Sequence, residues 1–487
     1  MRILSAIPAL FLLACSCGST PAQEQPADPD SGEGQARVYT TNTGHLRFAE
    51  SRVAVGEAHE DAFNVRLTGE EFQTVDGFGL AITQASCFNL LRMSEQDREA
   101  FLTEVFSREK GLGSSLIRVC IGGSDFSLDE FTWCDKRGME NFAVHPLDRQ
   151  YLFPILDQIY RINPDVQIIG SPWSCPLWMK MGENGSLPYD KWTGGRLNPL
   201  HYQEYAQYFV RWIQEMEGRG YCILAVTLQN EPLNRGNSMS LYMPWDDQLA
   251  FIKEAVGPAF AQAGLRTKIL IFDHNYNFDG MADQFDYPLR IYEDAEASAY
   301  VAGSAWHNYG GNVTTLDRIV QKAPDKEIYF TEASIGTWNY QYESCVINDF
   351  RDIFMGTLAR GGKGVTLWNL MLDDKRSPFR PGGCSTCFGA VTILSSTYAY
   401  ASISRNSHYY NVAHCSKAIH PGAVRLGTEG YQARGLSYQL YRNPDGSYGA
   451  ILLNESTVEV RLNLVTGQKS VTCKVPPSAI QSVVWSD

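Results

Sequence analysis

Short runs of apolar and β-branched residues recur along the chain, and each run ends in polar or aromatic residues. Eight such runs can be identified: Thr74–Thr83, Ser115–Phe126, Val166–Ser174, Ile223–Pro232, Lys268–Asn275, Gly303–Gly310, Glu327–Ile335 and Gly364–Leu372. Near-continuous apolar runs are typical of strands that are buried on both faces. Helix-like segments separate several of them: Ser94–Phe106, which opens with a possible N-cap serine, Pro199–Glu217 and Trp245–Ala263. Eight alternating strand and helix units over about 300 residues predict an α/β fold, a (β/α)8 barrel, spanning residues 74–405.

The two ends of the chain have a different pattern, in which short strands alternate between apolar and polar residues. Residues 37–73 and 406–487 contain such strands. The segment Asn443–Ser447 (NPDGS) predicts a hairpin turn, because Pro presets φ and Gly accepts a positive φ. We therefore expect one β-sandwich side domain built from both termini. A purely structural role is the simpler interpretation of this domain, and a carbohydrate-binding surface is the alternative.

An apolar stretch, Ile3–Ala14, follows Arg2. It is shorter than the roughly 20 residues that span a bilayer, so it predicts a secretory signal peptide. The stretch ends in Leu12–Cys15 (LLAC), which resembles a bacterial lipobox; a simple signal peptide that happens to carry a cysteine is the alternative. We expect residues 1–15 to be the signal with its lipobox and residues 16–36 to be a flexible tether. The expected location is the cell envelope, as an exported lipoprotein whose only membrane contact is the N-terminal lipid anchor.

Composition and charge narrow the class of protein further. Of the 487 residues, 44% are hydrophobic and 20% charged, which excludes a largely disordered or fibrous chain. The net charge of −13 and the absence of a basic run argue against nucleic-acid binding. There are twelve cysteines, and Cys384 and Cys387 form a single C-x-x-C pair. A zinc site would need a second pair, so a local disulfide or two free thiols are favoured. We expect no metal and no cofactor.

Ionisable and aromatic residues gather where the predicted barrel strands end. Because barrel active sites lie at the carboxyl ends of the strands, we expect these residues on one face. They are Arg118, Asp125, Trp173, Asn230, Glu231, Asp273, His274, His307, Tyr309, Glu332, Trp368 and Asn369. Asp273 and His274 have the weakest claim to a function, and we expect them to be structural. For Trp173 and Trp368 the alternative is barrel packing, for His307 a buried core histidine, and for Asp125 an ion pair with Arg118.

Two glutamates on opposing strands suit glycoside hydrolysis. One carboxyl group protonates the leaving oxygen, while the other attacks the anomeric carbon or activates water. Glu231 and Glu332 follow the fourth and seventh strands, where a barrel can bring them to the separation of about 5–5.5 Å that retention requires. Arg118 and the phenol of Tyr309 would donate hydrogen bonds that keep the nucleophile ionised. Asn230 would contact the sugar 2-hydroxyl.

Seven short motifs occur in a fixed order along the predicted barrel. They are GFGLAIT (Gly77–Thr83), SDFS (Ser124–Ser127), SPWSCPLWMK (Ser171–Lys180), LQNEP (Leu228–Pro232), HNY (His307–Tyr309), FTEAS (Phe330–Ser334) and LWN (Leu367–Asn369). Together they resemble glycoside hydrolase family 30, the family of glucosylceramidases and microbial β-1,6-glucanases. The segment His414–Thr428 is similar to the start of that family's side domain.

The resemblance implies roles for individual residues. Glu231 matches the acid/base and Glu332 the nucleophile. The positions that would line the sugar subsite are Arg118, Asp125, Trp173, Asn230, His307, Tyr309 and Trp368. Asp125 and Trp173 would hold the 4- and 6-hydroxyls of a glucose, and Trp173 and Trp368 would stack on sugar faces. That favours a glucosidase or glucanase over the xylanase branch.

Two further segments bear on the substrate. The loop Gly382–Ile393 looks more like the β-1,6-glucanase branch. Relatives commonly carry an Asp where this chain has Gln84, which leaves the finer substrate open. The expected activity is that of a retaining β-glycoside hydrolase acting on β-linked glucan, with an endo-β-1,6-glucanase preferred. The alternatives are an exo-acting β-glucosidase or glucosylceramidase-like enzyme, and a non-catalytic glycan-binding lipoprotein, against which the presence of both glutamates argues.

Overall fold

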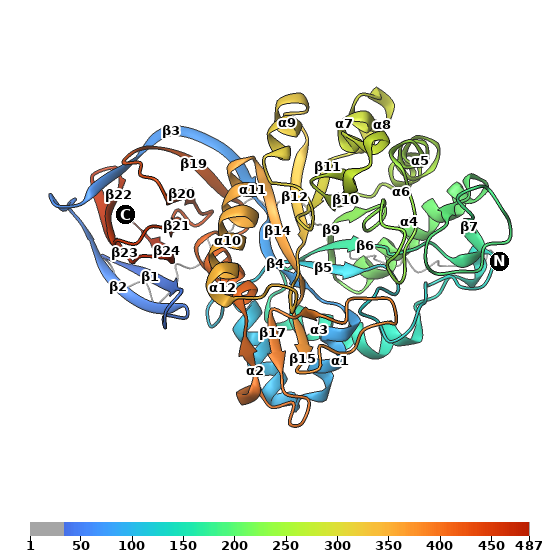
Figure 1. Ribbon diagram of the computed structural model, residues 1–487, viewed down its shortest axis with the longest axis horizontal. Helices are drawn as coiled ribbons and strands as arrows, with labels where there is room; N and C mark the ends of the chain where they lie inside the picture. The colour runs from blue at the N-terminus through green and yellow to red at the C-terminus, as the bar shows by residue number, and fades with distance from the viewer. Residues whose placement is uncertain (1–33, 487) are drawn as a thin grey trace, which may run out of the picture.

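The computed structural model describes residues 34–486, and Figure 1 shows two bodies side by side. A barrel of parallel strands surrounded by helices lies beside a smaller all-β body. The predicted signal peptide, its lipobox and most of the predicted tether lie outside the described residues. Within residues 34–486, none of the helices combines the length and apolar character needed to cross a membrane.

Eight parallel strands close the larger body in the order β10, β11, β12, β14, β4, β5, β6 and β9. Their bounds are β4 Gly77–Ala81, β5 Leu116–Cys120, β6 Gln167–Ser171, β9 Cys222–Thr227, β10 Lys268–Asn275, β11 Gly303–His307, β12 Glu327–Glu332 and β14 Gly362–Asn369. Each strand overlaps one of the eight apolar runs, so the predicted (β/α)8 barrel is confirmed.

Helices cover the outside of the barrel. They are α1 Gln84–Arg92, α2 Glu95–Phe106, α3 Phe153–Ile162, α4 Tyr202–Gly218, α5 Trp245–Phe251, α6 Gly257–Ala263, α7 Tyr287–Tyr292, α8 Ala295–Tyr300, α9 Thr315–Lys322, α10 Tyr342–Asp349, α11 Gly356–Ala359 and α12 Ser407–Ala418. Ser94 caps α2 by accepting a hydrogen bond from the Asp97 backbone N–H, as the sequence predicts. A π-helical turn, Ile252–Val256, joins α5 to α6, so the predicted helix over 245–263 is one continuous helical segment.

Side chains inside the barrel form two stacked layers. The lower layer contains one buried residue from each of six strands: Leu116, Ile169, Ala225, Leu270, Ala305 and Tyr329. Residues two apart on a strand point to the same side, so the next layer toward the carboxyl ends comes from the positions two residues further on. Five of these are Arg118, Ser171, Thr227, His307 and Thr331. The interior therefore changes from largely apolar to polar within one layer.

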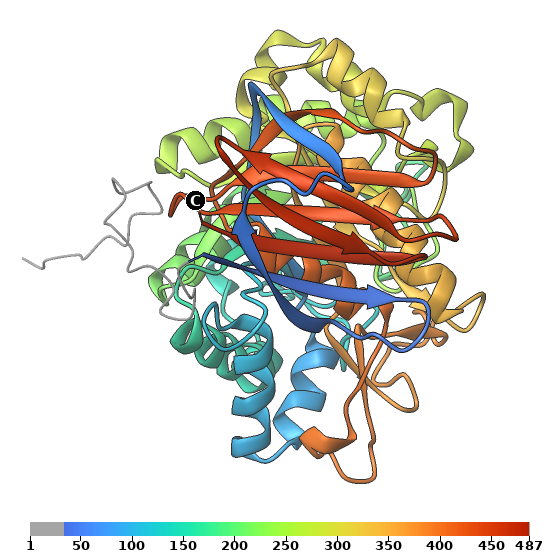
Figure 2. The same ribbon diagram turned by 90° about the vertical axis from the view of Figure 1, so that its left-hand side faces the viewer.

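The smaller body is a β-sandwich whose sheet closes in the order β1, β2, β23, β22, β3, β19, β20, β21 and β24. Its strands are β1 Gln35–Asn42, β2 Ala49–Gly56, β3 Phe63–Val75, β19 Ala423–Gly430, β20 Leu436–Arg442, β21 Tyr448–Asn454, β22 Val460–Thr466, β23 Lys469–Val475 and β24 Ala479–Trp485. Figure 2 shows the strands from the N-terminal part among those from the C-terminal part, and β1 pairs with β24. The prediction that both termini build this domain is confirmed.

The predicted hairpin turn at Asn443–Ser447 joins β20 to β21. The backbone N–H of Asn443 donates to the carbonyl of Ser447 at 2.8 Å, and Gly446 has a φ of 82°. The prediction that strands begin near Ser407 is wrong, because α12 fills Ser407–Ala418. This helix contacts β4 of the barrel and both β21 and β24 of the sandwich. Surrounded on nearly all sides, it lacks the polar face by which surface helices are recognised in a sequence.

Short strands at the carboxyl-end face organise the loops. They are β7 Lys180–Met181 with β8 Arg196–Leu197, β13 Ile335–Gly336 with β16 Cys387–Phe388, and β15 Met371–Asp373 with β17 Val391–Ile393 and β18 Ser404–Arg405. Cys384 and Cys387 are joined in a disulfide. Of the two interpretations of the C-x-x-C pair, the local disulfide is therefore the one found.

Candidate active site

A network of buried polar side chains lies at the carboxyl end of the barrel, with Arg118 at its centre. The guanidinium donates hydrogen bonds to Ser171 at 3.1 Å, Asp273 at 2.7 Å, Asn230 at 2.8 Å and Glu332 at 2.5 Å. Arg118 is only 1% exposed. A buried charge is tolerated only when it is paired and hydrogen-bonded, so these contacts hold the surrounding groups in fixed positions.

Asp273 belongs to this network, although the sequence led us to expect a purely structural role for it. Its carboxylate accepts hydrogen bonds from Thr227 at 2.7 Å and Thr331 at 2.6 Å, and lies 3.0 Å from Nε2 of His307. Burial alone would raise the pKa of Asp273, but Arg118 and His307 hold it below its usual value. Asp273 is therefore a fixed negative charge beneath the pocket.

A β-bulge in β10 explains why Asp273 points inward. The register between β10 and β11 shifts between Phe272 and His274, and both Phe272 and Asp273 have positive φ values, 71° and 66°. A bulge inserts one extra residue and re-aims the side chains that follow. Leu270 lies in the lower interior layer, so Asp273 enters the upper layer three positions later rather than two.

Glu332 ends β12 and is 6% exposed. One carboxylate oxygen accepts the hydrogen bond from Arg118, and the other accepts one from the hydroxyl of Tyr309 at 2.9 Å. That hydroxyl also lies 3.2 Å from Oγ of Ser334. Arg118 and Tyr309 are the two donors that the sequence suggested for this glutamate.

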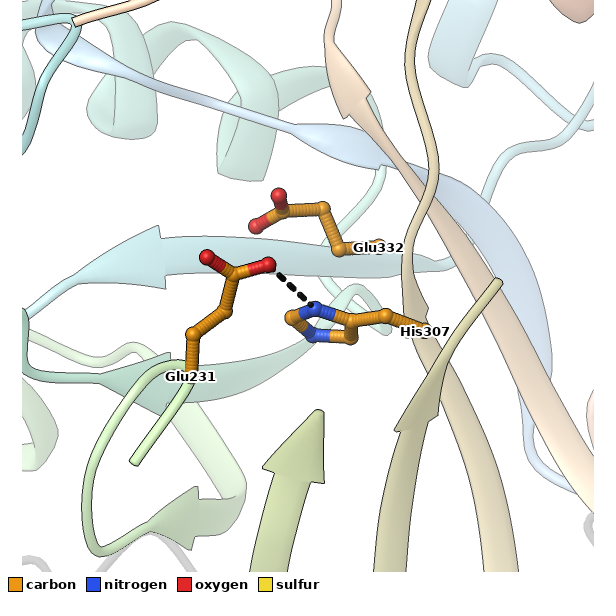
Figure 3. A group of neighbouring side chains, drawn as sticks. All are labelled: Glu231, His307 and Glu332. Carbon is orange, nitrogen blue, oxygen red and sulfur yellow. Dashed lines mark hydrogen bonds and ion pairs between the residues drawn. The ribbon is translucent and has the colours of Figure 1, made fainter. Parts of the chain in front are cut away.

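Glu231 lies in the loop after β9 and has a φ of 45°. One of its carboxylate oxygens accepts a hydrogen bond from Asn234 at 2.8 Å, and the other lies 3.4 Å from Nδ1 of His307 (Figure 3). One oxygen each from Glu231 and Glu332 and one nitrogen of His307 all lie within 4.8 Å of one another. The two carboxylates thus face each other at a separation suited to a retaining mechanism.

The charges in this group depend on one another. Burial would lower the pKa of His307, but Glu332, Asp273 and Glu231 raise it to about 9. Burial would raise the pKa of Glu231, but the contacts with His307 and His274 lower it to about 2. For Glu332, burial raises the pKa against the opposing effect of His307 and Arg118. The surrounding carboxylates therefore favour the protonated form of His307.

Two tryptophans pack over Arg118. Trp173 and Trp368 stack with ring centroids 5.1 Å apart, and the guanidinium lies 5.0 Å and 5.5 Å from their ring centres. Trp368 lines the pocket, whereas Trp173 does not and is 1% exposed. The expectation that both rings would stack on sugar faces therefore does not fit Trp173. Its indole N–H has no partner among the described residues, which suits it for donating a hydrogen bond.

A pocket of about 520 Å³ opens above the two glutamates, within the range of about 300–1,000 Å³ usual for ligand sites. Its lining includes Asp125, Glu231, His274, Tyr309, Glu332 and Trp368. Asp125 is not paired with Arg118, and one of its carboxylate oxygens has no partner in the described part of the chain. Burial, followed by the charges of Glu332 and Glu231, raises the pKa of Asp125.

Gln84 lies beside this site and holds a neighbouring loop in place. It is the first residue of α1, is buried, and accepts a hydrogen bond from the Leu128 backbone N–H at 2.7 Å. The segment that it holds carries Asp125 into the pocket. Gln84 also contacts the side chain of Asp148, whose pKa burial raises to about 7. An Asp at position 84 would place a second carboxylate beside Asp148, so the neutral amide suits this surrounding.

Glu231, His307 and Glu332 are also the only group among residues 34–486 with the spacing of a metal site. The two ring nitrogens of His307 face the carboxylates of Glu231 and Asp273. Both nitrogens are thus engaged by carboxylates, whose charges raise the pKa of His307 to about 9 and favour the doubly protonated ring. The group is better suited to moving protons than to binding a cation.

The barrel, its sandwich and the facing glutamates define the class of a barrel-type glycoside hydrolase. Comparison with family models gives the same result. Residues 75–419 match the glycosyl hydrolase family 30 TIM-barrel domain, and residues 422–483 match the family 30 beta sandwich domain. The chain belongs to glycoside hydrolase family 30.

Similar proteins include endo-1,6-β-glucanases and putative glucosylceramidases. A solved structure described as the endo-beta1,6-glucanase BT3312 is 47% identical, with a TM-score of 0.89 over 93% of this chain and 100% of that one. Endo-1,6-beta-D-glucanase neg1 of Aspergillus fumigatus is 31% identical over 84% of this chain and 86% of its own length. Putative glucosylceramidase 2 of Caenorhabditis elegans is 28% identical over 91% of this chain and 87% of its own length.

Proposed function

We propose that this protein is a retaining endo-β-1,6-glucanase that cleaves β-linked glucan by double displacement. The observation that carries the proposal is the pair of carboxylates, Glu231 and Glu332, whose oxygens lie within 4.8 Å across one pocket. The similarity to proteins described as endo-1,6-β-glucanases supports the choice of linkage. An exo-acting, glucosylceramidase-like enzyme is the second candidate, because glucosylceramidases are also among the relatives.

We assign the roles from the donors around each carboxylate. Both oxygens of Glu332 accept hydrogen bonds, from Arg118 and Tyr309. This arrangement stabilises an ionised carboxylate and orients it toward the anomeric carbon, as a nucleophile requires. Glu231 contacts His307 and Asn234, so it is the carboxyl group through which a proton can enter and leave. Glu231 is the acid/base in this proposal.

The pKa of Glu231 is lowered, although an acid must be protonated, and the pKa of Glu332 is raised, although a nucleophile must be ionised. These directions run against the assigned roles. The contact between His307 and Glu231 removes the conflict, since coupled groups share their protons as a unit. The proton on Nδ1 of His307 moves to Glu231, and Glu231 passes this proton on to the leaving oxygen. When Glu332 becomes a glycosyl ester, the site loses one negative charge. Glu231 then acts as the base that activates water.

The product profile on β-1,6-glucan tests this function, with p-nitrophenyl β-glucoside measured alongside. We expect a ladder of short oligosaccharides in which the new reducing end is first formed as the β-anomer, detected by NMR. Glucose as the sole product would favour the exo-acting candidate. Absence of hydrolysis of both substrates would contradict the proposal.

We also propose that the protein is exported and held at the cell envelope through a lipid on Cys15. The leader sequence supports this, and the Cys384–Cys387 disulfide is compatible with an oxidising compartment. Metabolic labelling with a fatty acid would test it. Label should be incorporated into the wild type and be absent from Cys15→Ala. Equal labelling of both would contradict the anchor.

A further inference from the structure

The pocket has a second wall to which the reaction assigns no role. It is formed by the loops after β12 and β14, which come together in the small β13–β16 sheet. The residues of this wall that line the pocket are Ser334, Trp338, Gly382, Gly383, Cys384, Thr386 and Cys387. None of them reaches across to Glu231, so the wall is available to a different part of the substrate.

Trp338 is the most unusual residue of this wall. Its side chain is 50% exposed, and it is the only tryptophan among the exposed large apolar side chains of residues 34–486. Half of a large apolar ring is thus in water at the edge of a polar pocket. Such surfaces mark places where a ligand binds, because covering them is favourable. The exposed face of Trp338 therefore needs a flat, partly apolar partner.

The ring of Trp338 is held in position. A Cβ at Gly336 would lie 2.0 Å from Cζ3 of Trp338, so only glycine lets the ring lie this close to the backbone. Gly336 in turn pairs with Cys387 across the β13–β16 sheet, and the Thr337 N–H donates to the Thr386 carbonyl at 3.0 Å. The ring rests on a short sheet and does not have to be ordered when a ligand arrives.

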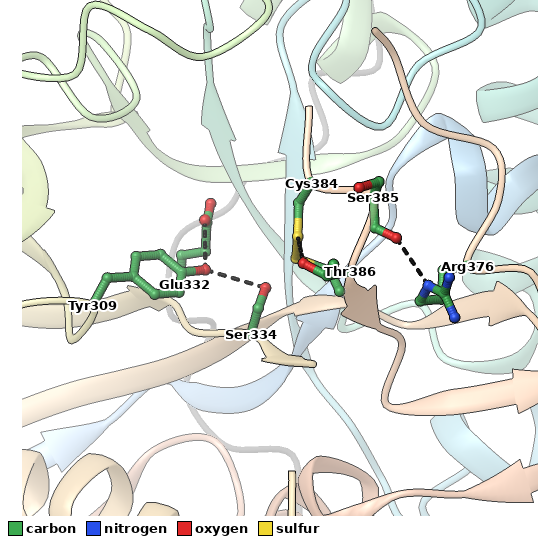
Figure 4. Close-up of a disulfide and its surroundings, with 8 residues drawn as sticks. Tyr309, Glu332, Ser334, Arg376, Cys384, Ser385 and Thr386 are labelled. Carbon is green, nitrogen blue, oxygen red and sulfur yellow. Dashed lines mark hydrogen bonds between the residues drawn. A yellow bond between two sulfur atoms is a disulfide. The ribbon is translucent and has the colours of Figure 1, made fainter. Parts of the chain in front are cut away.

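The disulfide loop extends this wall toward the reacting centre. Figure 4 shows the disulfide beside Thr386, with Ser334 between it and Tyr309 in the view. At the other end of the loop, a Cβ at Gly383 would lie 2.8 Å from Cβ of Asp125. The wall is therefore continuous from Asp125 to Trp338.

We propose that Trp338 is the stacking platform for a second glucosyl unit, beside the one held between Glu231 and Glu332, with the Cys384–Cys387 loop as the side of that subsite. The proposal rests on the function proposed above and names the residue that favours a glucan chain over a single glucoside. A β-glucosyl ring carries its hydroxyl groups around its edge, which leaves two flat C–H faces. One face would cover the exposed side of Trp338, and the edge hydroxyls would reach Ser334 and Thr386.

The first experiment compares kcat/KM on β-1,6-glucan with kcat/KM on p-nitrophenyl β-glucoside. For Trp338→Ala, we expect the ratio of the two values to fall about tenfold, mainly through KM on glucan, because one stacked ring face is lost. Trp338→Phe keeps an aromatic platform and should keep the ratio within about threefold of the wild type. The matched control is Phe72→Ala, which removes a 45% exposed ring from β3 of the sandwich, and its ratio should equal that of the wild type.

The second experiment measures binding in the Glu332→Gln background, where turnover does not interfere. A β-1,6-linked gluco-oligosaccharide should change the tryptophan fluorescence of this variant, and the change should be much smaller in Glu332→Gln/Trp338→Phe. The oligosaccharide should also lose its advantage in affinity over glucose in Glu332→Gln/Trp338→Ala.

Two outcomes would overturn the proposal. One is a ratio of kcat/KM values in Trp338→Ala within about twofold of the wild type. The other is oligosaccharide binding that is equal with and without Trp338. If the wild type hydrolyses neither substrate, the proposed function fails. The binding experiment still decides on Trp338, because a platform must bind the oligosaccharide whether or not it is cleaved.

Discussion

Two fully buried histidines, His307 at the barrel mouth and His414 in α12, show how differently one side chain is used in this protein. His307 lies between the carboxylates of Glu231 and Asp273, and these charges with that of Glu332 raise its pKa to about 9. Burial lowers the pKa of His414 to about 3.

The neighbours of His414 account for this difference. Its two nitrogens lie 2.9 Å and 2.8 Å from the hydroxyls of Ser482 and Thr41, which are neutral donors and acceptors. His414 therefore remains uncharged and ties α12 to both ends of the chain. His307 is charged because three carboxylates surround it, a costly arrangement that packing alone would not require. Burial is common to both sites, and only the charges around the ring separate a proton carrier from a structural link.

Replacing Glu332, the nucleophile at the barrel mouth, should have the largest effect on turnover. Glu332→Ala should lower turnover by about 10⁵-fold or more, because the covalent step is lost. Added azide should restore cleavage of an activated aryl glucoside and give an α-configured glycosyl azide, identified by NMR. The fold should persist, since the variant removes one of several crowded carboxylates. If azide gives no such product, Glu332 is not the nucleophile.

Removing the acid should have an effect that depends on the leaving group. Glu231→Ala should slow cleavage of β-1,6-glucan by about 10³-fold, because its leaving hydroxyl needs a proton. Hydrolysis of an aryl glucoside with a good leaving group should slow far less in its first step. Pre-steady-state release of the phenol separates that step from deglycosylation. Equal losses on both substrates would remove Glu231 from the acid role.

Neutralising Asp273, the fixed charge beneath the pocket, should change the pKa of His307. Asp273→Asn removes one of the carboxylates that raise the pKa of His307, so that pKa should fall from about 9. In the wild type, activity should decline as pH rises through about 9, where His307 loses its proton. In Asp273→Asn the alkaline limb of kcat should lie at lower pH, and kcat itself should fall about 10²-fold. An alkaline limb at the same pH in both proteins would show that His307 does not control it.

Replacing His414 should change the stability of the protein without changing catalysis. The pKa of His414 is lowered in the folded protein, so the unfolded chain binds an extra proton between about pH 6.5 and 3. The stability that neutral His414 contributes is present above that window and is lost as pH falls through it, by up to about 1.4 kcal/mol per pH unit. His414→Gln should therefore show a weaker dependence of the urea midpoint on pH between 7 and 4. A changed kcat in this variant would contradict the separation of the two regions.

The parts of the structure that the sequence revealed are those with a regular pattern. Buried parallel strands read as apolar runs, and residues such as Glu231 and Glu332 could be found because they follow the runs. Asp273 was undervalued because its inward direction depends on a bulge, and a shift of one position cannot be read from alternation. Trp338 was missed because its loop has no period, and its exposure depends on how Gly336 and Cys387 pair.

The pairing of β1 with β24 has a consequence for the order of events during synthesis. β1 ends at residue 42 and its partner β24 begins at residue 479, so more than 400 residues are synthesised before β1 can pair with β24. Contacts so distant in sequence form late and slowly. The sandwich of a nascent chain thus stays incompletely folded until β24 has been made. A truncation that removes β24 would leave β1 without the strand on which it closes.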